Sequence, residues 1–125
     1  MKKLSLGILL VAGAMLLVPG AGRAGDADVV DATIEHRADG TFTVRATVRH
    51  GDEGWDHYAN GFDVMDPDGA VLGTRVLAHP HVNEQPFTRS LRGLVVPAGV
   101  ARVMVRAQDS VHGHGGGSVV LEIPR

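Results

Sequence analysis

Short runs of alternating apolar and polar residues, separated by turn residues, are the feature that most constrains the fold of this chain. In residues 42–49 every second side chain from Phe42 to Val48 is apolar, and threonine or arginine lies between. Residues 103–107 and 119–123 repeat this period of two, which places successive side chains on opposite faces of a β-strand. No segment shows sustained helical periodicity. The pattern predicts an all-β domain in which each strand buries one face.

Turn residues divide the chain into seven such strands. Glycine, proline and aspartate at 38–40, 66–69 and 97–99 are typical of tight reversals, and the other three connections are long. Seven antiparallel strands in about 100 residues resemble an immunoglobulin-like or fibronectin type III-like sandwich, here without the hallmark disulfide because the chain has no cysteine. The predicted strands cover residues 28–37, 41–49, 59–66, 70–78, 87–96, 100–110 and 118–124.

The first 24 residues have the composition of a cleaved secretory signal peptide. Two lysines precede an apolar run over residues 4–18, and small residues stand at Gly22 and Ala24. The run is shorter than the roughly 20 residues that a membrane span needs. Without cysteine, the sequence also offers no lipoprotein acylation site. We therefore expect residues 1–24 to be removed, which leaves a single domain over residues 25–125, periplasmic or secreted, that begins at Gly25 or Asp26.

The charge of this domain excludes two classes of partner. Loss of Lys2, Lys3 and Arg23 leaves nine arginines, no lysine and fourteen carboxylates, a net charge of −5. Binding to nucleic acid or to anionic lipid needs a basic face, which this composition does not provide. We expect neither nucleic-acid binding nor membrane association after cleavage.

Histidine is concentrated in the three long connections, at residues 50–58, 79–86 and 111–117. Because antiparallel strands alternate in direction, these three connections should meet at one pole of the sandwich. Two H-x-H pairs occur there, and alternate residues of an extended chain project from the same face about 6.6 Å apart, so both rings can reach one ion. Six of the seven histidines lie in these connections: His50, His57, His79, His81, His112 and His114.

These residues predict a metal site at the histidine-rich pole. Strand phase directs Asp109 inward, and a buried aspartate needs a partner such as an imidazole. Imidazole and carboxylate ligands without thiolate suit Cu(II) or Zn(II). The expected ligands are His79, His81, His112 and His114, followed by His57, with Asp109, Glu84 and His50 as supporting groups or alternative ligands.

The sequence leaves three functions open. The first is an exported metal-binding module, which can also have a periplasmic protein partner. The alternative to this metal site is that the loop histidines only form hydrogen bonds that stabilise the loops. The second is a non-catalytic domain that binds a protein or glycan through Trp55 and Tyr58, the only tryptophan and tyrosine. The third is a small metalloenzyme, which would need an open coordination position and an acid/base such as Glu84. No pattern in the chain indicates a deep substrate pocket, so the sequence does not favour an enzyme.

Overall fold

The computed structural model describes residues 15–18 and 25–125. Most of the predicted signal peptide therefore lies outside the described residues. Within the described ranges, no helix is long and apolar enough to cross a membrane. The strands are β1 (Met15–Val18), β2 (Asp28–His36), β3 (Phe42–Arg49), β4 (Ala59–Met65), β5 (Val71–Val76), β6 (Phe87–Leu94), β7 (Arg102–Asp109) and β8 (Ser118–Glu122).

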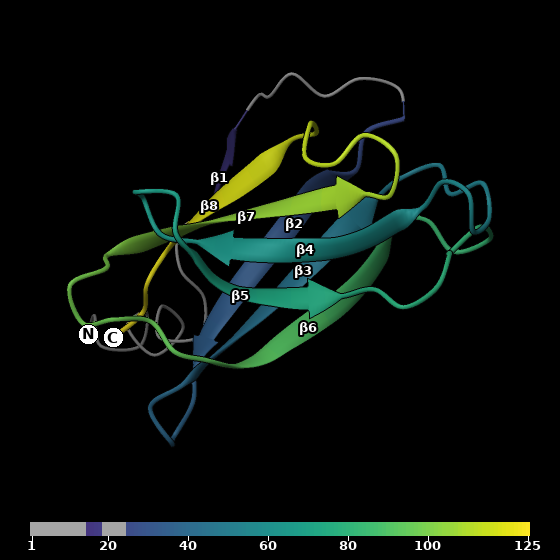
Figure 1. Cartoon of the computed structure of the whole chain (residues 1–125). Helices are drawn as coiled ribbons and strands as arrows, with labels where there is room; N and C mark the ends of the chain where they lie inside the picture. Colours follow the sequence, from purple (N-terminus) through teal and green to yellow (C-terminus); the bar gives the residue numbers. More distant parts are fainter. Residues whose placement is uncertain (1–14, 19–24) are drawn as a thin grey trace, which may run out of the picture.

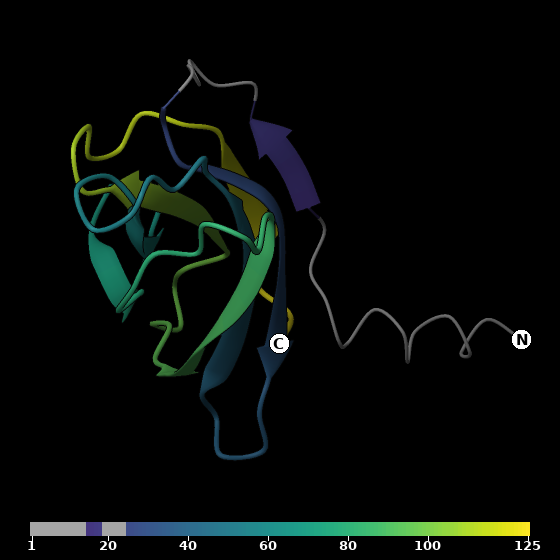
Figure 2. The ribbon, with the colours of Figure 1, turned by 90° about the vertical axis from the view of Figure 1, so that its right-hand side faces the viewer.

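Two antiparallel sheets pack as a sandwich (Figure 1). One has the strand order β1-β8-β7-β4-β5 and the other the order β2-β3-β6. The prediction of seven antiparallel strands in a sandwich is confirmed by β2 to β8, whose ends lie within two residues of the predicted ones. The additional strand β1 falls within the predicted signal peptide and pairs with β8 at the edge of the larger sheet, as Figure 2 shows.

The core lies between the sheets and is built from the alternating apolar faces. In β3, Phe42, Val44, Ala46 and Val48 are at most 1% exposed, whereas the residues between them are half-buried or exposed. The inward side chains of β4, β7 and β8 meet them from the other sheet. All residues of this buried core lie between Ala27 and Leu121.

The strand directions gather the three long connections at one pole, on the right in Figure 1. β3, β5 and β7 end there, and β2, β4, β6 and β8 begin there. Hydrogen bonds join the connections directly. The Ser110 N–H donates to the Tyr58 carbonyl at 2.9 Å, and the His81 N–H donates to Asp52 at 2.6 Å. Loops that are far apart in the sequence thus form one surface.

Candidate metal centre

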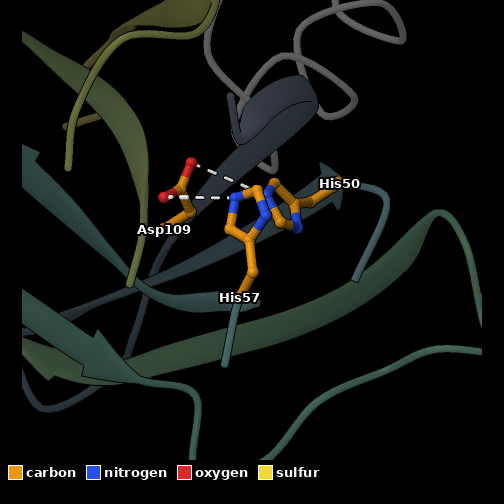
Figure 3. A group of neighbouring side chains, drawn as sticks. All are labelled: His50, His57 and Asp109. Atoms are coloured by element: carbon orange, nitrogen blue, oxygen red, sulfur yellow. Dashed lines mark ion pairs between the residues drawn. The ribbon is translucent and has the colours of Figure 1, made fainter. Parts of the chain in front are cut away.

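Three histidines and two aspartates lie together at this pole. One ligand atom from each of His50, His57 and Asp109 lies within 4.8 Å of the others (Figure 3). The same holds for one ligand atom from each of Asp26, Asp109 and His112. Because Asp109 belongs to both groups, we treat them as one set and call it the His/Asp cluster.

The cluster is assembled from both sheets of the sandwich. His50 directly follows β3 and Asp26 lies just before β2, so these two residues come from the three-stranded sheet. His57 lies just before β4, Asp109 ends β7 and His112 follows it, so these three come from the five-stranded sheet. The site therefore depends on the packing of the whole sandwich, not on one loop.

Glycines in the connection after β7 let this loop approach the segment before β2. A Cβ on Gly116 would lie 2.0 Å from the carbonyl oxygen of Ala27, a distance that no side chain can occupy. The Gly117 N–H donates to Asp28 Oδ1 at 2.7 Å and holds the two segments together. This close backbone packing carries Asp26 to the side of the loop that follows β7.

Asp109 is a buried carboxylate that its own loop supplies with hydrogen bonds. It accepts from the backbone N–H of Val111 at 2.8 Å and from that of His112, and its Oδ2 lies 3.1 Å from Nδ1 of His112. Backbone hydrogen bonds between Asp109 and Gly113 close the turn. Burial acts to raise the pKa of Asp109, but these backbone hydrogen bonds and the His112 imidazole hold it below its usual range. The carboxylate is therefore charged at neutral pH.

Three imidazole nitrogens converge on the carbonyl oxygen of Gly25. Nε2 of His50 lies 2.9 Å from it, Nε2 of His57 lies 3.2 Å away, and Nδ1 of His112 lies 3.2 Å away. The two Nε2 atoms are also each 3.6 Å from a different oxygen of Asp109. The side chains of His50 and Asp109 have no exposed surface, whereas that of His112 is 43% exposed. The cluster thus opens to solvent at His112.

Two carboxylates outside the cluster orient two of its imidazoles. Nδ1 of His50 lies 2.5 Å from Oδ1 of Asp52, and Nδ1 of His57 lies 3.0 Å from Oε1 of Glu53. A carboxylate at one ring nitrogen fixes the proton there and leaves the other nitrogen as the potential ligand. The hydrogen bond to Glu53 also raises the pKa of His57; burial opposes this rise, and the Asp109 carboxylate and a backbone carbonyl add to it.

This arrangement is chemically suited to a cation. In the form of each ring that carries a single proton on Nδ1, the Nε2 lone pairs of His50 and His57 face carbonyl and carboxylate oxygens, which are also acceptors. Acceptors that face one another are unfavourable unless a proton or a metal ion lies among them. Imidazole nitrogens together with carboxylate oxygens are ligands of divalent metals. The buried His/Asp groups can hold a metal ion.

The sequence-predicted pair His79 and His81 lies outside the His/Asp cluster. Their ring centroids are 4.6 Å apart, and the His81 ring stacks on Phe87 at 4.0 Å. Nε2 of His81 accepts a hydrogen bond from Arg89 at 3.0 Å. Burial lowers the pKa of His81, and the charges of Arg89 and His79 add to this effect, so the ring is neutral at pH 7. Its backbone N–H donates to Asp52, which orients His50. The HPH motif thus contacts the cluster indirectly.

The second H-x-H pair is divided between two environments. His112 belongs to the cluster, whereas Nε2 of His114 lies 3.1 Å from Oδ2 of Asp63 on β4. Gly113 between them has a φ of +70°, so the backbone turns and is not extended there. Glu84, the expected acid/base of an enzyme, forms an exposed ion pair with Arg89 at 3.3 Å.

Trp55 and Tyr58 lie in the connection that also carries His57. Their rings meet edge to face with centroids 5.6 Å apart. The residue Trp55 is 67% exposed, so it does not close the core. An exposed tryptophan beside a polar cluster is available to a partner.

The sequence predicts only part of this site. It indicates His57 and His112 as ligands and Asp109 and His50 as supporting groups, whereas Asp26 of the cluster, and the Gly25 carbonyl and Asp52 beside the cluster, emerge only from the structure. A signal for Asp52 existed, since a carboxylate two residues after a loop histidine can orient its ring. No local signal marks Gly25 and Asp26, because their position depends on packing against the distant glycine loop.

Comparison with known proteins shows similarity to a protein of Halomicrobium mukohataei. This protein, named "Putative lipoprotein", is 38% identical over 97 residues, which cover 78% of this chain and 47% of the relative. The chain thus spans about half the length of the curated relative it matches. No family model matches the sequence, and no solved structure matches it.

Proposed function

We propose that the protein is an exported metal-binding β-sandwich module that holds Cu(II) or Zn(II) at the histidine-rich pole. The observation that carries this proposal is the convergence of imidazole nitrogens and carboxylate oxygens from both sheets on one point. Its ligands are drawn from the cluster: His50, His57 and Asp109, with the exposed His112 and the buried Asp26 beside them.

The chemistry of the donors supports these two ions. Nitrogen and carboxylate ligands without thiolate favour Cu(II) and Zn(II), whereas Ca²⁺ and Mg²⁺ prefer sites made only of oxygen. Asp52 and Glu53 hold two of the rings by Nδ1, as carboxylates do in many metal sites. His79 and His81 act in this proposal through Asp52 and not as ligands, because the His81 ring is engaged with Phe87 and Arg89.

Export is supported by two independent features. The first 24 residues have the signal-peptide pattern of a basic start, an apolar stretch and a small-residue cleavage site. The relative from Halomicrobium mukohataei is named a lipoprotein. We place the domain outside the cytoplasm, where the ion would be acquired.

Thermal unfolding with and without an excess of metal tests the proposal. Free Cu(II) or Zn(II) at 100 times its Kd stabilises the native state by about 2.7 kcal/mol, which raises the Tm of a domain this size by at least about 10 °C. Paired His57→Gln and Asp109→Asn changes should abolish the shift. The matched control is His36→Gln, at the opposite end of β2. An unchanged Tm in the wild-type protein, or an unchanged shift in the paired variant, would rule the site out.

The exposed Trp55 favours a second candidate, a protein- or glycan-binding surface at the same pole. This surface would use Trp55 and Tyr58 and would not need a metal. Binding to immobilised glycans that persists in chelator and is lost in Trp55→Ala would support this function. Retention of all glycan or protein binding by Trp55→Ala would exclude it.

A further inference from the structure

The backbone of Gly25 lies among the imidazoles of the His/Asp cluster. Its carbonyl oxygen is 2.9 Å from Nε2 of His50 and 3.2 Å from nitrogens of both His57 and His112. A Cβ on Gly25 would lie 3.1 Å from Cε1 of His112 and 3.6 Å from Cε1 of His57, and φ is +94°. Only glycine fits this position without strain. The nitrogen of Gly25 is three bonds from its own carbonyl oxygen and so lies within about 3.6 Å of it.

The sequence places a predicted cleavage site directly before this residue. Small residues at Gly22 and Ala24 stand third and first before the Ala24–Gly25 bond, as leader peptidases require. Hydrolysis of that bond consumes one water and leaves a carboxylate on Ala24 and an ammonium group on Gly25. In the uncut chain the Gly25 nitrogen is an amide, whose lone pair is delocalised into the carbonyl and is a poor ligand. In the cut chain, loss of one proton turns it into a free amine.

We propose that removal of the leader after Ala24 completes the metal site by adding the α-amine of Gly25 to the His/Asp cluster. The proposal rests on the proposed function and deepens it by naming how metal binding is regulated. The amine nitrogen and the carbonyl oxygen of one residue form a five-membered chelate with an ion. Full metal affinity is then acquired only on export, and the uncut chain stays a weak binder.

The mature N-terminus is held in position by the fold. Ala27 is fully buried, and the Asp28 carboxylate accepts from the Gly117 N–H at 2.7 Å. The Val29 N–H donates to the Gly117 carbonyl at 2.9 Å. Cleavage removes β1 from the edge of β8, and the buried core among residues 25–125 begins at Ala27 and stays in the processed chain. The amine is thus delivered by an anchored segment and does not have to be ordered by the metal.

The composition of the chain allows a test at a single atom. Residues 25–125 contain no lysine, so the α-amine is the only primary amine of the processed protein. The full chain is expressed with its own leader, and the exported form is purified and its mass measured. One half is acetylated with an amine-specific reagent and treated with hydroxylamine to clear acyl groups from histidine and tyrosine. Cu(II) affinity is then measured for both halves by competition with a chromogenic chelator.

We expect the exported protein to begin at Gly25 and acetylation to weaken Cu(II) binding at least tenfold, with a changed Cu(II) EPR spectrum and an unchanged metal-free Tm. Equal Cu(II) affinity with and without the acetyl group would overturn this inference and leave the proposed function standing. A mature N-terminus other than Gly25 would do the same. Failure of both forms to bind Cu(II) or Zn(II) would overturn the proposed function itself.

Discussion

One buried carboxylate, Asp52, is predicted to be the most sensitive single position of the histidine-rich pole. It accepts from Nδ1 of His50 at 2.5 Å, from the Ala59 N–H at 3.0 Å and from the His81 N–H at 2.6 Å. Its side chain has no exposed surface. Asp52 thereby connects the end of β3, the start of β4 and the loop before β6.

The cost of removing this carboxylate follows from the three donors that it leaves behind. Each buried donor without an acceptor costs about 1–3 kcal/mol, and water that enters the space offsets part of this. We expect Asp52→Ala to lower the free energy of unfolding by about 3–6 kcal/mol, a large fraction of the 5–15 kcal/mol typical of a domain. Asp52→Asn keeps one acceptor oxygen and should cost roughly half as much. In the asparagine variant, metal affinity should also fall by about 10–100-fold, because a neutral amide oxygen orients the His50 ring more weakly than the carboxylate does.

Urea unfolding measures this effect against a matched control. Asp66 also accepts from two backbone N–H groups, those of Asp68 and Ala70, each at 2.9 Å, but in an exposed turn. Water can replace its carboxylate, so Asp66→Ala should cost only about 0.5–1.5 kcal/mol. If the free energies of unfolding of Asp52→Ala and Asp66→Ala lie within about 1 kcal/mol of each other, burial does not make the loss of the Asp52 hydrogen bonds more costly, and the reasoning is wrong.

Three further results are expected. The pKa of His57 is raised in the folded protein, so its imidazolium stabilises the fold. This stabilisation is complete below pH about 6.5 and is lost as the pH rises through the pKa of the folded state. In the presence of chelator, the Tm should therefore fall over this pH window more in the wild type than in His57→Gln. Gly116→Ala should lower the free energy of unfolding by about 1–3 kcal/mol in urea titrations, since the new Cβ would lie 2.0 Å from the Ala27 carbonyl oxygen. By competition with a chelator, His112→Ala should weaken metal binding whereas His114→Ala should not, because the His114 ring pairs with a carboxylate outside the cluster.

The sandwich could be predicted from the sequence because its signal is local and repeated. The period of two in residues 42–49 matches the alternating burial of β3, and the short turns mark the strand ends. The gathering of the three long connections at one pole could also be predicted, since a connection between antiparallel strands lies at one end of the sandwich or the other. These inferences need no knowledge of how distant loops pack.

The membership of the cluster could be predicted only in part. The expectation for the H-x-H pairs assumed extended backbone, but Gly113 turns the chain and directs His112 and His114 to different carboxylates. The His81 ring stacks on Phe87, a contact that depends on the loop folding back onto β6. Asp26 reaches the cluster only because glycines elsewhere allow two backbones to touch. Such contacts arise from tertiary packing and leave no periodic trace in the sequence.

The origin of the cluster in both sheets has a consequence for how the protein comes apart. A metal ion bound by Asp26 and Asp109 would close a loop of more than eighty residues, as a disulfide would, in a chain that has no cysteine. By the loop-entropy relation for cross-links of that length, such a closure destabilises the unfolded chain by about 4.5 kcal/mol. The two sheets could then separate only after the ion had left. Resistance to unfolding would be set by the rate of metal release, and a chelator would act on this protein as a reductant acts on a disulfide-linked sandwich.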